Sequence, residues 1–242
     1  DFHLAEALSA VAPMPGPHRA FFANSGTEAN EAALKLAKYT TKRHNVIAFL
    51  GAFHGRSMGS LSVTASKVRQ RQGFGPLVPG TFHAPYPDVY RSGLSPDATA
   101  AQAIDFIEQQ LFVHLVAPDE VAAVIVEPIQ GEGGFYVAPK ELMTRLRKLC
   151  DDHGILLIAD EIQSGFGRTG DNFWAFEAHD IVPEIVVMAK GIGNGFPLGA
   201  VVAQRHIAEK LAGKFTFHTY GASPTSCAAG RAVLKVIDEE KT

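Results

Sequence analysis

Short apolar runs alternate along this chain with longer segments whose apolar residues recur every three or four positions. Continuous apolar runs are typical of strands buried on both faces, and the longer spacing is typical of amphipathic helices. The runs predict strands at residues 45–50, 121–126, 155–160, 185–189 and 200–203, and the periodic segments predict helices at residues 1–12, 26–40, 96–111, 139–153 and 227–237. This alternation predicts an α/β fold with a mostly parallel sheet covered by helices.

Two of the predicted strands end on charged residues. The run that starts at Ile155 ends on the acidic pair Asp160 and Glu161, and the run IVVMA ends at Lys190. The carboxyl ends of parallel strands meet at one edge of a sheet, where ligands bind. A carboxylate and an amine at this edge suit pyridoxal phosphate, because its aldehyde condenses with a lysine and its pyridine nitrogen needs a carboxylate to stay protonated. The plainer alternative is an aspartate that caps a helix and a lysine that reaches solvent.

The helix predicted at residues 26–40 begins in the segment ANSGTEAN. Ser25, with Glu28 three residues later, fits a capping box. Free backbone N–H groups and the helix dipole also make such a terminus a place for an anion, and the hydroxyls of Ser25 and Thr27 add donors. Simple capping and phosphate binding both fit this segment.

Other polar and aromatic residues follow the remaining predicted strands. Phe53 and His54 stand between glycines, where an aromatic ring can stack on a ligand ring. A Phe that fills the core and a His that caps the turn are the alternative. Glu127 ends one strand and Glu132 lies in the glycine-rich turn after it, where both also fit an ordinary surface turn.

Composition and charge exclude several classes of protein. The chain has 242 residues, of which 46% are hydrophobic and 19% charged, so it can bury a sizeable core. Its net charge of -3 gives no general attraction for nucleic acid or anionic membrane surfaces, and no partner of either kind is expected. No run approaches the roughly 18 apolar residues of a spanning helix. No metal site is predicted.

The cysteines and the start of the sequence add two expectations. Cys150 and Cys227 are too few for a disulfide framework, and their apolar surroundings predict reduced, buried thiols and a cytoplasmic location. The sequence starts at Asp1 rather than Met, and Phe2, Leu4, Leu8 and Val11 already follow a helical pattern there. We therefore expect this sequence to be the middle of a longer protein.

Six motifs occur in a fixed order: SGTEANEA, GAFHG, EPIQGEGG, ADEIQSGFGRTG, MAKG with GFPLGA, and HTYGASP. Together they closely resemble the class III, or ω-aminotransferase, branch of the type I fold pyridoxal phosphate enzymes, over nearly the whole chain. Enzymes of the 4-aminobutyrate and acetylornithine type belong to this branch. The resemblance implies that residues 1–242 are the large cofactor-binding domain, without the family's N-terminal segment and C-terminal small domain.

The resemblance assigns the centre of the cofactor site residue by residue. Lys190 matches the lysine that forms the Schiff base and later moves the proton between substrate carbon and cofactor. Asp160 matches the carboxylate that pairs with the pyridinium nitrogen, and Gln163 matches the residue that hydrogen-bonds the ring hydroxyl. Phe53 matches the aromatic ring stacked on the cofactor, and His54 beside it is placed in the same site.

The resemblance also assigns the edges of this site. The phosphate cup is matched by three residues, namely Ser25, Gly26 and Thr27. Thr219 matches a threonine that reaches the phosphate in the neighbouring subunit, which implies a homodimer with shared active sites. Glu127 matches a glutamate close to the cofactor. Glu132 resembles the gate glutamate that pairs with an arginine and moves when an α-carboxylate binds, and that arginine belongs to the C-terminal domain.

Two details differ from the commoner family pattern. Ser223 stands where an asparagine is frequent before the proline. Residues 66–87, rich in Gly and Pro, are expected to form a long loop. Around His83 in this loop there is no arginine at the place where γ-aminobutyrate-type enzymes hold the substrate carboxylate. The missing arginine argues against γ-aminobutyrate as the amino donor. Other ω-amino acids, acetylornithine-like donors and diamines stay possible.

The resemblance implies an aminotransferase that moves an amino group from an amino acid or ω-amine to a 2-oxo acid. Racemases and decarboxylases of the same family use the same lysine and aspartate and are alternatives. A truncated domain that binds the cofactor or a partner without turnover is another. A nicotinamide-dependent dehydrogenase does not fit, because the first strand-to-helix turn lacks GxGxxG.

Overall fold

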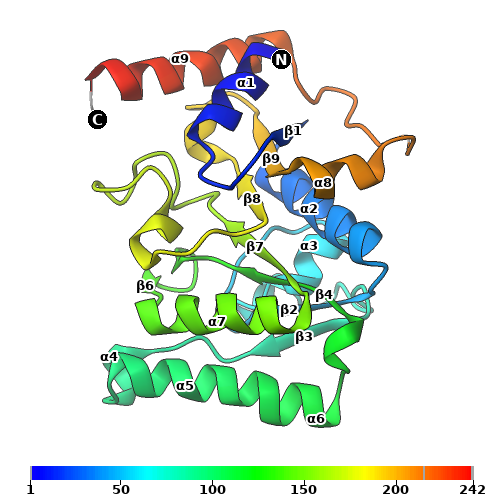
Figure 1. Ribbon diagram of the computed structural model, residues 1–242, viewed down its shortest axis with the longest axis vertical. Helices are drawn as coiled ribbons and strands as arrows, with labels where there is room; N and C mark the ends of the chain where they lie inside the picture. Colours follow the sequence, from blue (N-terminus) through cyan, green and yellow to red (C-terminus); the bar gives the residue numbers. More distant parts are fainter. Residues whose placement is uncertain (1, 215, 241–242) are drawn as a thin grey trace.

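A twisted seven-stranded sheet runs through the computed structural model, which describes residues 2–214 and 216–240 (Figure 1). The strand order is β1-β9-β8-β7-β4-β2-β3. The strands are β1 (His18–Ala23), β2 (Asn45–Phe49), β3 (Thr81–Ala84), β4 (Val121–Val126), β7 (Leu156–Asp160), β8 (Ile185–Met188) and β9 (Gly199–Gln204). Two short strands, β5 (Ile129–Gln130) and β6 (Tyr136–Val137), form a separate antiparallel pair.

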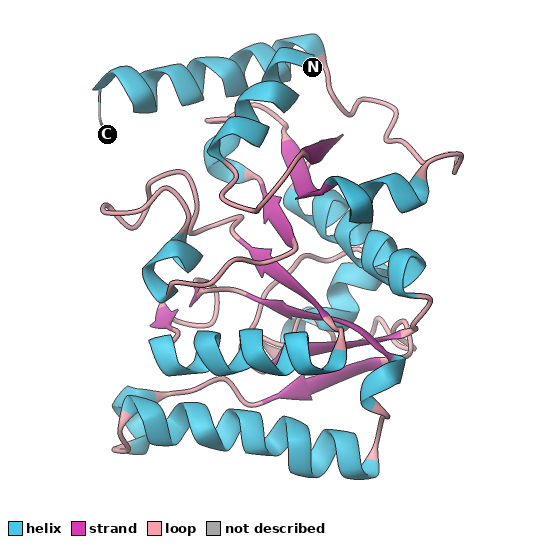
Figure 2. Ribbon diagram, viewed as in Figure 1, coloured by secondary structure: helices cyan, strands magenta, loops and turns pink. Residues whose placement is uncertain are grey.

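Five adjacent strands, from β3 to β8, are parallel, whereas β9 is antiparallel to both of its neighbours. Helices flank the sheet on both faces (Figure 2). They are α1 (Phe2–Val11), α2 (Gly26–Thr41), α3 (Met58–Val63), α4 (Val89–Ser92), α5 (Pro96–Phe106), α6 (Phe112–His114), α7 (Lys140–His153), α8 (Arg205–Ala208) and α9 (Pro224–Glu240). A π-helical turn (Ile107–Leu111) joins α5 to α6. The predicted α/β fold with a mostly parallel sheet is confirmed.

Side chains that alternate along each strand divide the core between the two faces. In β4, Val124 and Val126 belong to the apolar cluster that also contains side chains of α5 and α7. Ala123 and Ile125 belong to a second cluster, which contains side chains of α2. All six residues of β4 are buried, as the continuous apolar run predicts. Burial on both faces fixes the register of the central strands and thereby the position of the side chains at their ends.

Two strands of the sheet were missed by the sequence pattern. Residues 81–84 form β3 inside the segment expected to be a loop, and residues 18–23 form β1, for which no strand was predicted. Both lie at the edges of the sheet, where one long side stays unpaired and a full apolar run is not required. Gly80 and Pro85 bound β3 so closely that its four residues give little periodicity.

Several local predictions are also settled. Leu4 and Leu8 of α1 are fully buried, but Phe2 is 67% exposed, so it does not belong to the buried stripe. Asp1 lies outside the described residues. Pro139 is the N-cap of α7 rather than its first helical residue.

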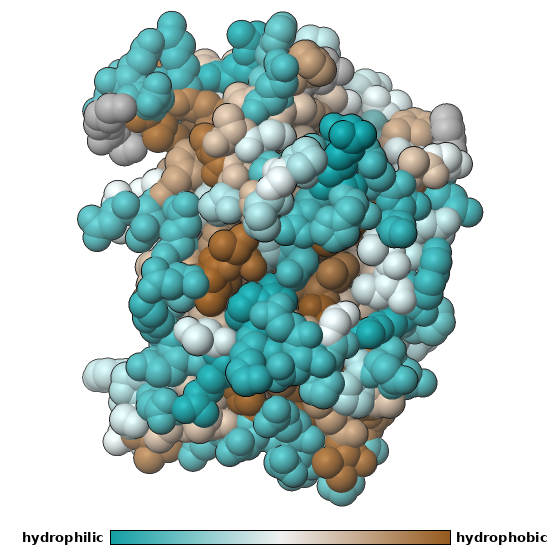
Figure 3. Space-filling model, in the orientation of Figure 1, coloured by the Kyte–Doolittle hydropathy of each residue, from teal (hydrophilic) through white to brown (hydrophobic). Residues whose placement is uncertain are grey.

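Figure 3 shows apolar surface beneath α9, on the side that this helix turns toward the rest of the molecule. Among the described residues, no helix has both the length and the apolar character needed to cross a membrane.

Candidate cofactor site

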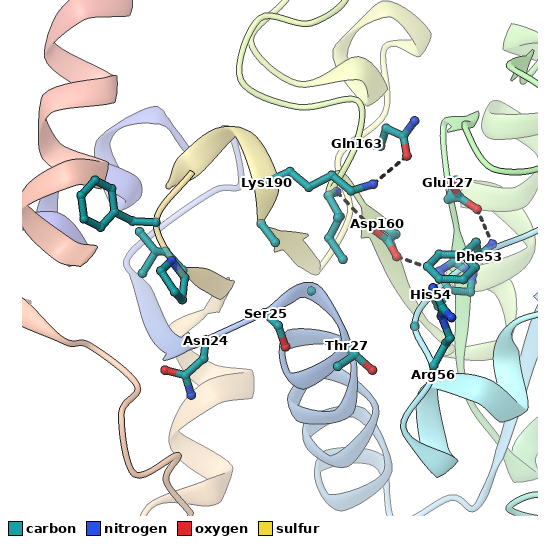
Figure 4. Close-up of a pocket in the computed structure, with 17 residues that line it drawn as sticks. Asn24, Ser25, Thr27, Phe53, His54, Arg56, Glu127, Asp160, Gln163 and Lys190 are labelled. Carbon is teal, nitrogen blue, oxygen red and sulfur yellow. Dashed lines mark hydrogen bonds and ion pairs between the residues drawn. The ribbon is translucent and has the colours of Figure 1, made fainter. Parts of the chain in front are cut away.

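A pocket of about 420 Å³ lies where four strands of the sheet end. Asp160 is the last residue of β7, Glu127 directly follows β4, and Lys190 follows β8 after one intervening residue. Phe53 and His54 come from the segment after β2. All five residues line this pocket, as do residues at the start of α2 (Figure 4). The structure therefore brings together residues that the strand-end pattern placed at one edge of the sheet.

The N-terminus of α2 forms one wall of this pocket. Ser25 is the N-cap, and Gly26 and Thr27 are the first helical residues, so their N–H groups have no acceptor within the helix. A Cβ on Gly26 would lie 2.8 Å from Ile162 Cδ1, so the smallest residue lets the helix come this close. The helix dipole and the free N–H groups suit an anion at this end of the pocket.

The capping box is present only in part. Glu28 N donates to Ser25 Oγ at 3.4 Å, as predicted. The Glu28 carboxylate, however, accepts from Asn24, at 2.7 Å from the backbone N and 2.9 Å from Nδ2, rather than from the N–H of the N-cap residue. The hydrogen bond from the Glu28 carboxylate thus goes to Asn24, one residue before the N-cap, and it holds the segment that leads into α2.

Asp160 is held at the base of the pocket by a set of donors. Its Oδ2 accepts from Asn30 Nδ2 at 2.8 Å and from His54 Nδ1 at 2.7 Å, and its Oδ1 accepts from Ile162 N at 3.1 Å. A carboxylate has about four lone-pair sites, so one acceptor position on Oδ1 is left for a ligand. Asp160 is 3% exposed, and its orientation is therefore fixed before any ligand arrives.

His54 lies behind Asp160, with its ring fully buried. Burial acts to lower the pKa of His54, but the hydrogen bond and the charge of Asp160, with the charge of Glu127, outweigh it, so the pKa is raised. A raised pKa keeps the imidazole as a donor to Asp160. Its Nε2 is buried and has no hydrogen-bond partner among the described residues.

Glu127 connects two segments of the pocket wall. Its Oε1 accepts from Phe53 N at 2.8 Å, and its Oε2 accepts from Gly131 N at 3.3 Å. Burial is the main cause that raises the pKa of Glu127, to about 7, against the nearby charge of His54, which lowers it. Because Glu127 accepts a hydrogen bond from the backbone of Phe53, it fixes the position of Phe53, whose ring lines the pocket.

Lys190 and Gln163 both line the pocket and contact each other. Lys190 Nζ donates to Gln163 Oε1 at 2.7 Å (Figure 4). The backbone of Lys190 has φ = 48°, which costs about 1–3 kcal/mol in a residue with a side chain and persists only where its surroundings impose it. A second cavity of about 500 Å³ shares Lys190, Gln163 and Ile162 with the first. The amine thus lies between two connected cavities.

Two predicted site residues do not line the pocket. Glu132 lies in an exposed turn and pairs with Lys67, at 2.6 Å between Oε1 and Nζ. Thr219 is exposed and outside the pocket lining. Their roles as gate and as donor to a neighbouring subunit stay predictions.

Two residues that line or support the pocket were not singled out in the sequence. Arg56 lines it, with its guanidinium carbon 6.0 Å from the centre of the Phe53 ring, and it has no carboxylate partner in the described part of the chain. Its position two residues after His54, in GAFHGRS, was the available signal. Asn30 is fully buried and bonds Asp160 as well as His54 O, at 2.7 Å. Asn30 lies one helical turn after Gly26, on the helix face toward the sheet. Its partner Asp160 is 130 positions away in the sequence, so no local sequence signal points to this contact.

The family model described as Aminotransferase class-III matches residues 2–242, so the chain belongs to this family. The 5-aminovalerate aminotransferase DavT of Pseudomonas aeruginosa is 44% identical over 238 residues, which cover 98% of this chain and 54% of that protein. The alanine/serine racemase of Pyrococcus horikoshii is 37% identical over 243 residues, covering 98% of this chain and 51% of that protein.

A solved structure shows the same fold. It is an amine transaminase from an uncultivated Pseudomonas species, in its PLP-bound form, with a TM-score of 0.90 and 33% identity. The match covers 99% of this chain and 57% of that one. The chain spans about half the length of the curated relatives it matches.

Proposed function

We propose that this chain provides the pyridoxal phosphate site of an aminotransferase, which moves an amino group from an amino acid or ω-amine to a 2-oxo acid. The observation that carries this proposal is one pocket that gathers the Lys190 amine, the buried Asp160 carboxylate and the N-terminus of α2. These three features match the aldehyde, the pyridine nitrogen and the phosphate of that cofactor. The family and the PLP-bound relative support it.

The residues present fit this cofactor on chemical grounds. Ser25, Gly26 and Thr27 would hold the phosphate, because the free N–H groups of α2 point to one place. Phe53 would pack on the ring, and the open acceptor position on Asp160 Oδ1 would take the hydrogen of the pyridine nitrogen. His54 and Asn30 would act through Asp160, since both donate to its other oxygen. Residues 1–242 would thus form the large, cofactor-binding domain.

When bound, pyridoxal phosphate supplies an aldehyde that condenses with amines and a protonated ring that accepts electrons from the substrate carbon. Lys190 Nζ is the base that takes the proton from the donor carbon and later returns one. Gln163 orients this amine through the 2.7 Å bond to its Oε1, and in the loaded site its amide would meet the ring hydroxyl. Asp160, whose two oxygens both accept hydrogen bonds from the protein, would present its free acceptor position on Oδ1 to the hydrogen of the ring nitrogen.

The positive charge of Arg56 at the pocket wall indicates the substrate class. Arg56 is exposed at the pocket wall without a carboxylate partner in the described residues, so we propose that it binds the carboxylate of an amino acid donor. Arg56 would thus supply the positive charge that the loop around His83 lacks. The P. aeruginosa relative is named for 5-aminovalerate, in which the amine and the carboxylate lie at opposite ends. An ω-amino acid donor with a 2-oxo acid acceptor is therefore the favoured pair.

A racemase is the second candidate, because the P. horikoshii relative is an alanine/serine racemase. Lys190 would serve that reaction too, since both reactions begin with removal of a proton from the carbon that bears the amine. The decisive difference is the need for an acceptor. A racemase inverts L-alanine without any 2-oxo acid, whereas an aminotransferase without an acceptor stops after one half-reaction, with the amino group left on the cofactor.

The assembly and the location of the whole protein are also proposals. We expect a homodimer with shared active sites, in which Thr219 serves the neighbour's phosphate and Glu132 acts as a gate beside the pocket, and a cytoplasmic location. Mixing two inactive variants, Lys190→Ala and Thr219→Ala, should restore part of the activity if each site draws Thr219 from the partner. No restoration in a mixture proven to exchange subunits would argue against shared sites.

The reaction is tested by a half-reaction screen on the full-length protein. The loaded protein is mixed with single amines, and the carbonyl product and the aminated cofactor are quantified by mass spectrometry. We expect one equivalent of carbonyl product per site from ω-amino acids, and further turnover only after a 2-oxo acid is added. Inversion of L-alanine without an acceptor would favour the racemase, and the absence of any product from the screened amines would contradict both.

A further inference from the structure

The side chain of Glu132 is held by two donors that flank one short helical turn. Lys67 Nζ donates to Glu132 Oε1 at 2.6 Å and to Glu132 O at 3.3 Å. Gln70 Nε2 donates to the same Oε1 at 3.3 Å. The Ser66 hydroxyl donates to Gln70 Oε1, which leaves the amide hydrogens of Gln70 for Glu132. We name Lys67 and Gln70 the clamp, because together they hold both the backbone and the carboxylate of Glu132.

The backbone brings the clamp and the turn of Glu132 to the same place. Gly51 N donates to Ala65 O at 3.0 Å, which holds the segment that leads to Lys67. A Cβ on Gly133 would lie 2.6 Å from Gly51 O, so the turn of Glu132 packs on the same residue. The position of Lys67 beside Glu132 therefore depends on the main chain as well as on the ion pair.

The turn of Glu132 also packs beside the amine of Lys190. A Cβ on Gly131 would lie 2.4 Å from Gln163 Cδ, so the residue before Glu132 touches the side chain whose Oε1 accepts from Lys190 Nζ. Gly131 and Lys190 also line the second cavity together. The hydrogen bond and the charge of Lys67 are the main causes that lower the pKa of Glu132, and the charge of Lys190 adds to them. Glu132 thus lies close to the amine, although its side chain is held away from the pocket.

A free carboxylate at this place would affect substrates unequally. In an α-amino acid the carboxylate is bonded to the carbon that bears the amine, and in a 2-oxo acid it is bonded to the carbonyl carbon. This carbon must come next to Lys190, so its carboxylate would meet the like charge of a released Glu132, and like charges side by side oppose binding. An ω-amino acid carries its carboxylate several bonds away, and a plain amine or aldehyde has none.

We propose that Lys67 is a positioning residue that determines the acceptance of α-carboxylates: by holding Glu132 outside the pocket, it keeps the space beside Lys190 open to 2-oxo acids and α-amino acids. This inference rests on the proposed function, because it assumes that the reaction takes place at Lys190. Lys67 lines neither of the two cavities that contain Lys190, so it acts through Glu132.

The test compares two kinds of acceptor in the full-length protein loaded with pyridoxamine phosphate. Single-turnover rate constants are measured by absorbance for butanal, which has no carboxylate, and for the fastest of pyruvate, oxaloacetate and 2-oxoglutarate. We expect Lys67→Met to lower the second-order rate constant for the 2-oxo acid about fivefold, the upper end for loss of an exposed ion pair, and to leave that for butanal unchanged. Lys67→Arg should keep most of the rate, because a guanidinium can still bind the carboxylate.

A matched control and a double variant make the test specific. Arg69 is exposed in the same turn and donates no hydrogen bond to Glu132 in the described part of the chain, so Arg69→Met should keep the ratio of the two rate constants. Glu132→Gln removes the charge that the clamp holds, so adding Lys67→Met to it should cost nothing further. The same fivefold loss in this background would show that Lys67 does not act through Glu132 and would overturn the proposal, as would an equal loss for butanal.

The unmodified protein separates this inference from the proposed function. If it aminates none of the three 2-oxo acids, the proposed function is wrong and the role of Lys67 is wrong with it. If it aminates them and Lys67→Met keeps the ratio of the two rate constants, only the role of Lys67 is wrong. Circular dichroism controls for loss of folding, and Lys67→Ala carries the comparison if Lys67→Met does not fold.

Discussion

Glu161 follows the catalytic candidate Asp160 but faces the interior, and it gives the stability of this protein a specific pH dependence. Its side chain is fully buried, and its oxygens accept from Ser164 Oγ at 2.7 Å and from Phe176 N at 2.9 Å. Burial raises the pKa of Glu161 from 4.5 to about 7, although these hydrogen bonds lower it. The perturbation that isolates this effect is Glu161→Gln, which keeps the shape and an acceptor oxygen but does not ionise.

The sign follows from proton binding. Between pH 4.5 and 7 the folded state keeps a proton that the unfolded state has lost, so the contribution of Glu161 to stability is present below pH 4.5 and is lost as pH rises to 7. The change from 4.5 to about 7 corresponds to about 3 kcal/mol, at about 1.4 kcal/mol for each tenfold change in proton binding. Most of this loss, about 2 kcal/mol, falls between pH 5 and pH 8.

The assay is urea unfolding of both proteins at pH 5 and pH 8. We expect the free energy of unfolding of the unmodified protein to fall by about 2 kcal/mol more than that of Glu161→Gln over this interval. Glu177→Gln is the matched control, because Glu177 lies in the same segment and accepts from Trp174 N at 2.9 Å but is only half-buried. If Glu161→Gln and the unmodified protein lose the same free energy, the burial argument for Glu161 is refuted.

Three further changes test the site. Asp160→Asn removes the carboxylate that we propose pairs with the ring nitrogen, so single-turnover amine transfer should slow about 100-fold or more, while an unchanged rate would exclude this role. Gly55→Ala places a Cβ 2.4 Å from Thr27 Oγ1 at φ = 130°, so thermal unfolding should shift to lower temperature and cofactor affinity should fall; unchanged values of both would contradict the packing argument. Arg56→Gln should raise KM about tenfold or more for carboxylate-bearing donors and leave plain amines unaffected, and an equal effect on both would refute carboxylate recognition.

The sequence predicted the parts of this molecule that depend on continuous burial. The central strands appeared as apolar runs because both of their faces are covered, and their ends placed Asp160, Glu127 and Lys190 at one edge. The edge strands β1 and β3 were not predicted, because their partial burial leaves no continuous run of apolar residues. The class III family, which six ordered motifs pointed to, is confirmed by a match over residues 2–242.

The parts that could not be predicted depend on contacts between distant segments. Asn30 looks like an ordinary helical residue, and only the packing of α2 on β7 brings its amide to Asp160. Asp160 and Glu161 look equivalent as an acidic pair, yet successive residues at the end of a strand point to opposite sides. One therefore faces the pocket, and the other accepts hydrogen bonds from the segment that contains Ser164 and Phe176.

The most direct test of the cofactor site is the position of covalent attachment. The protein is incubated with pyridoxal phosphate and reduced with borohydride, and its peptides are mapped by mass spectrometry. We expect the label on Lys190, with none at this peptide in Lys190→Ala and no loss of label in the control variant Lys148→Ala, whose lysine is exposed on α7. A label spread over exposed lysines, or equal labelling of Lys190→Ala, would contradict the assignment of this pocket.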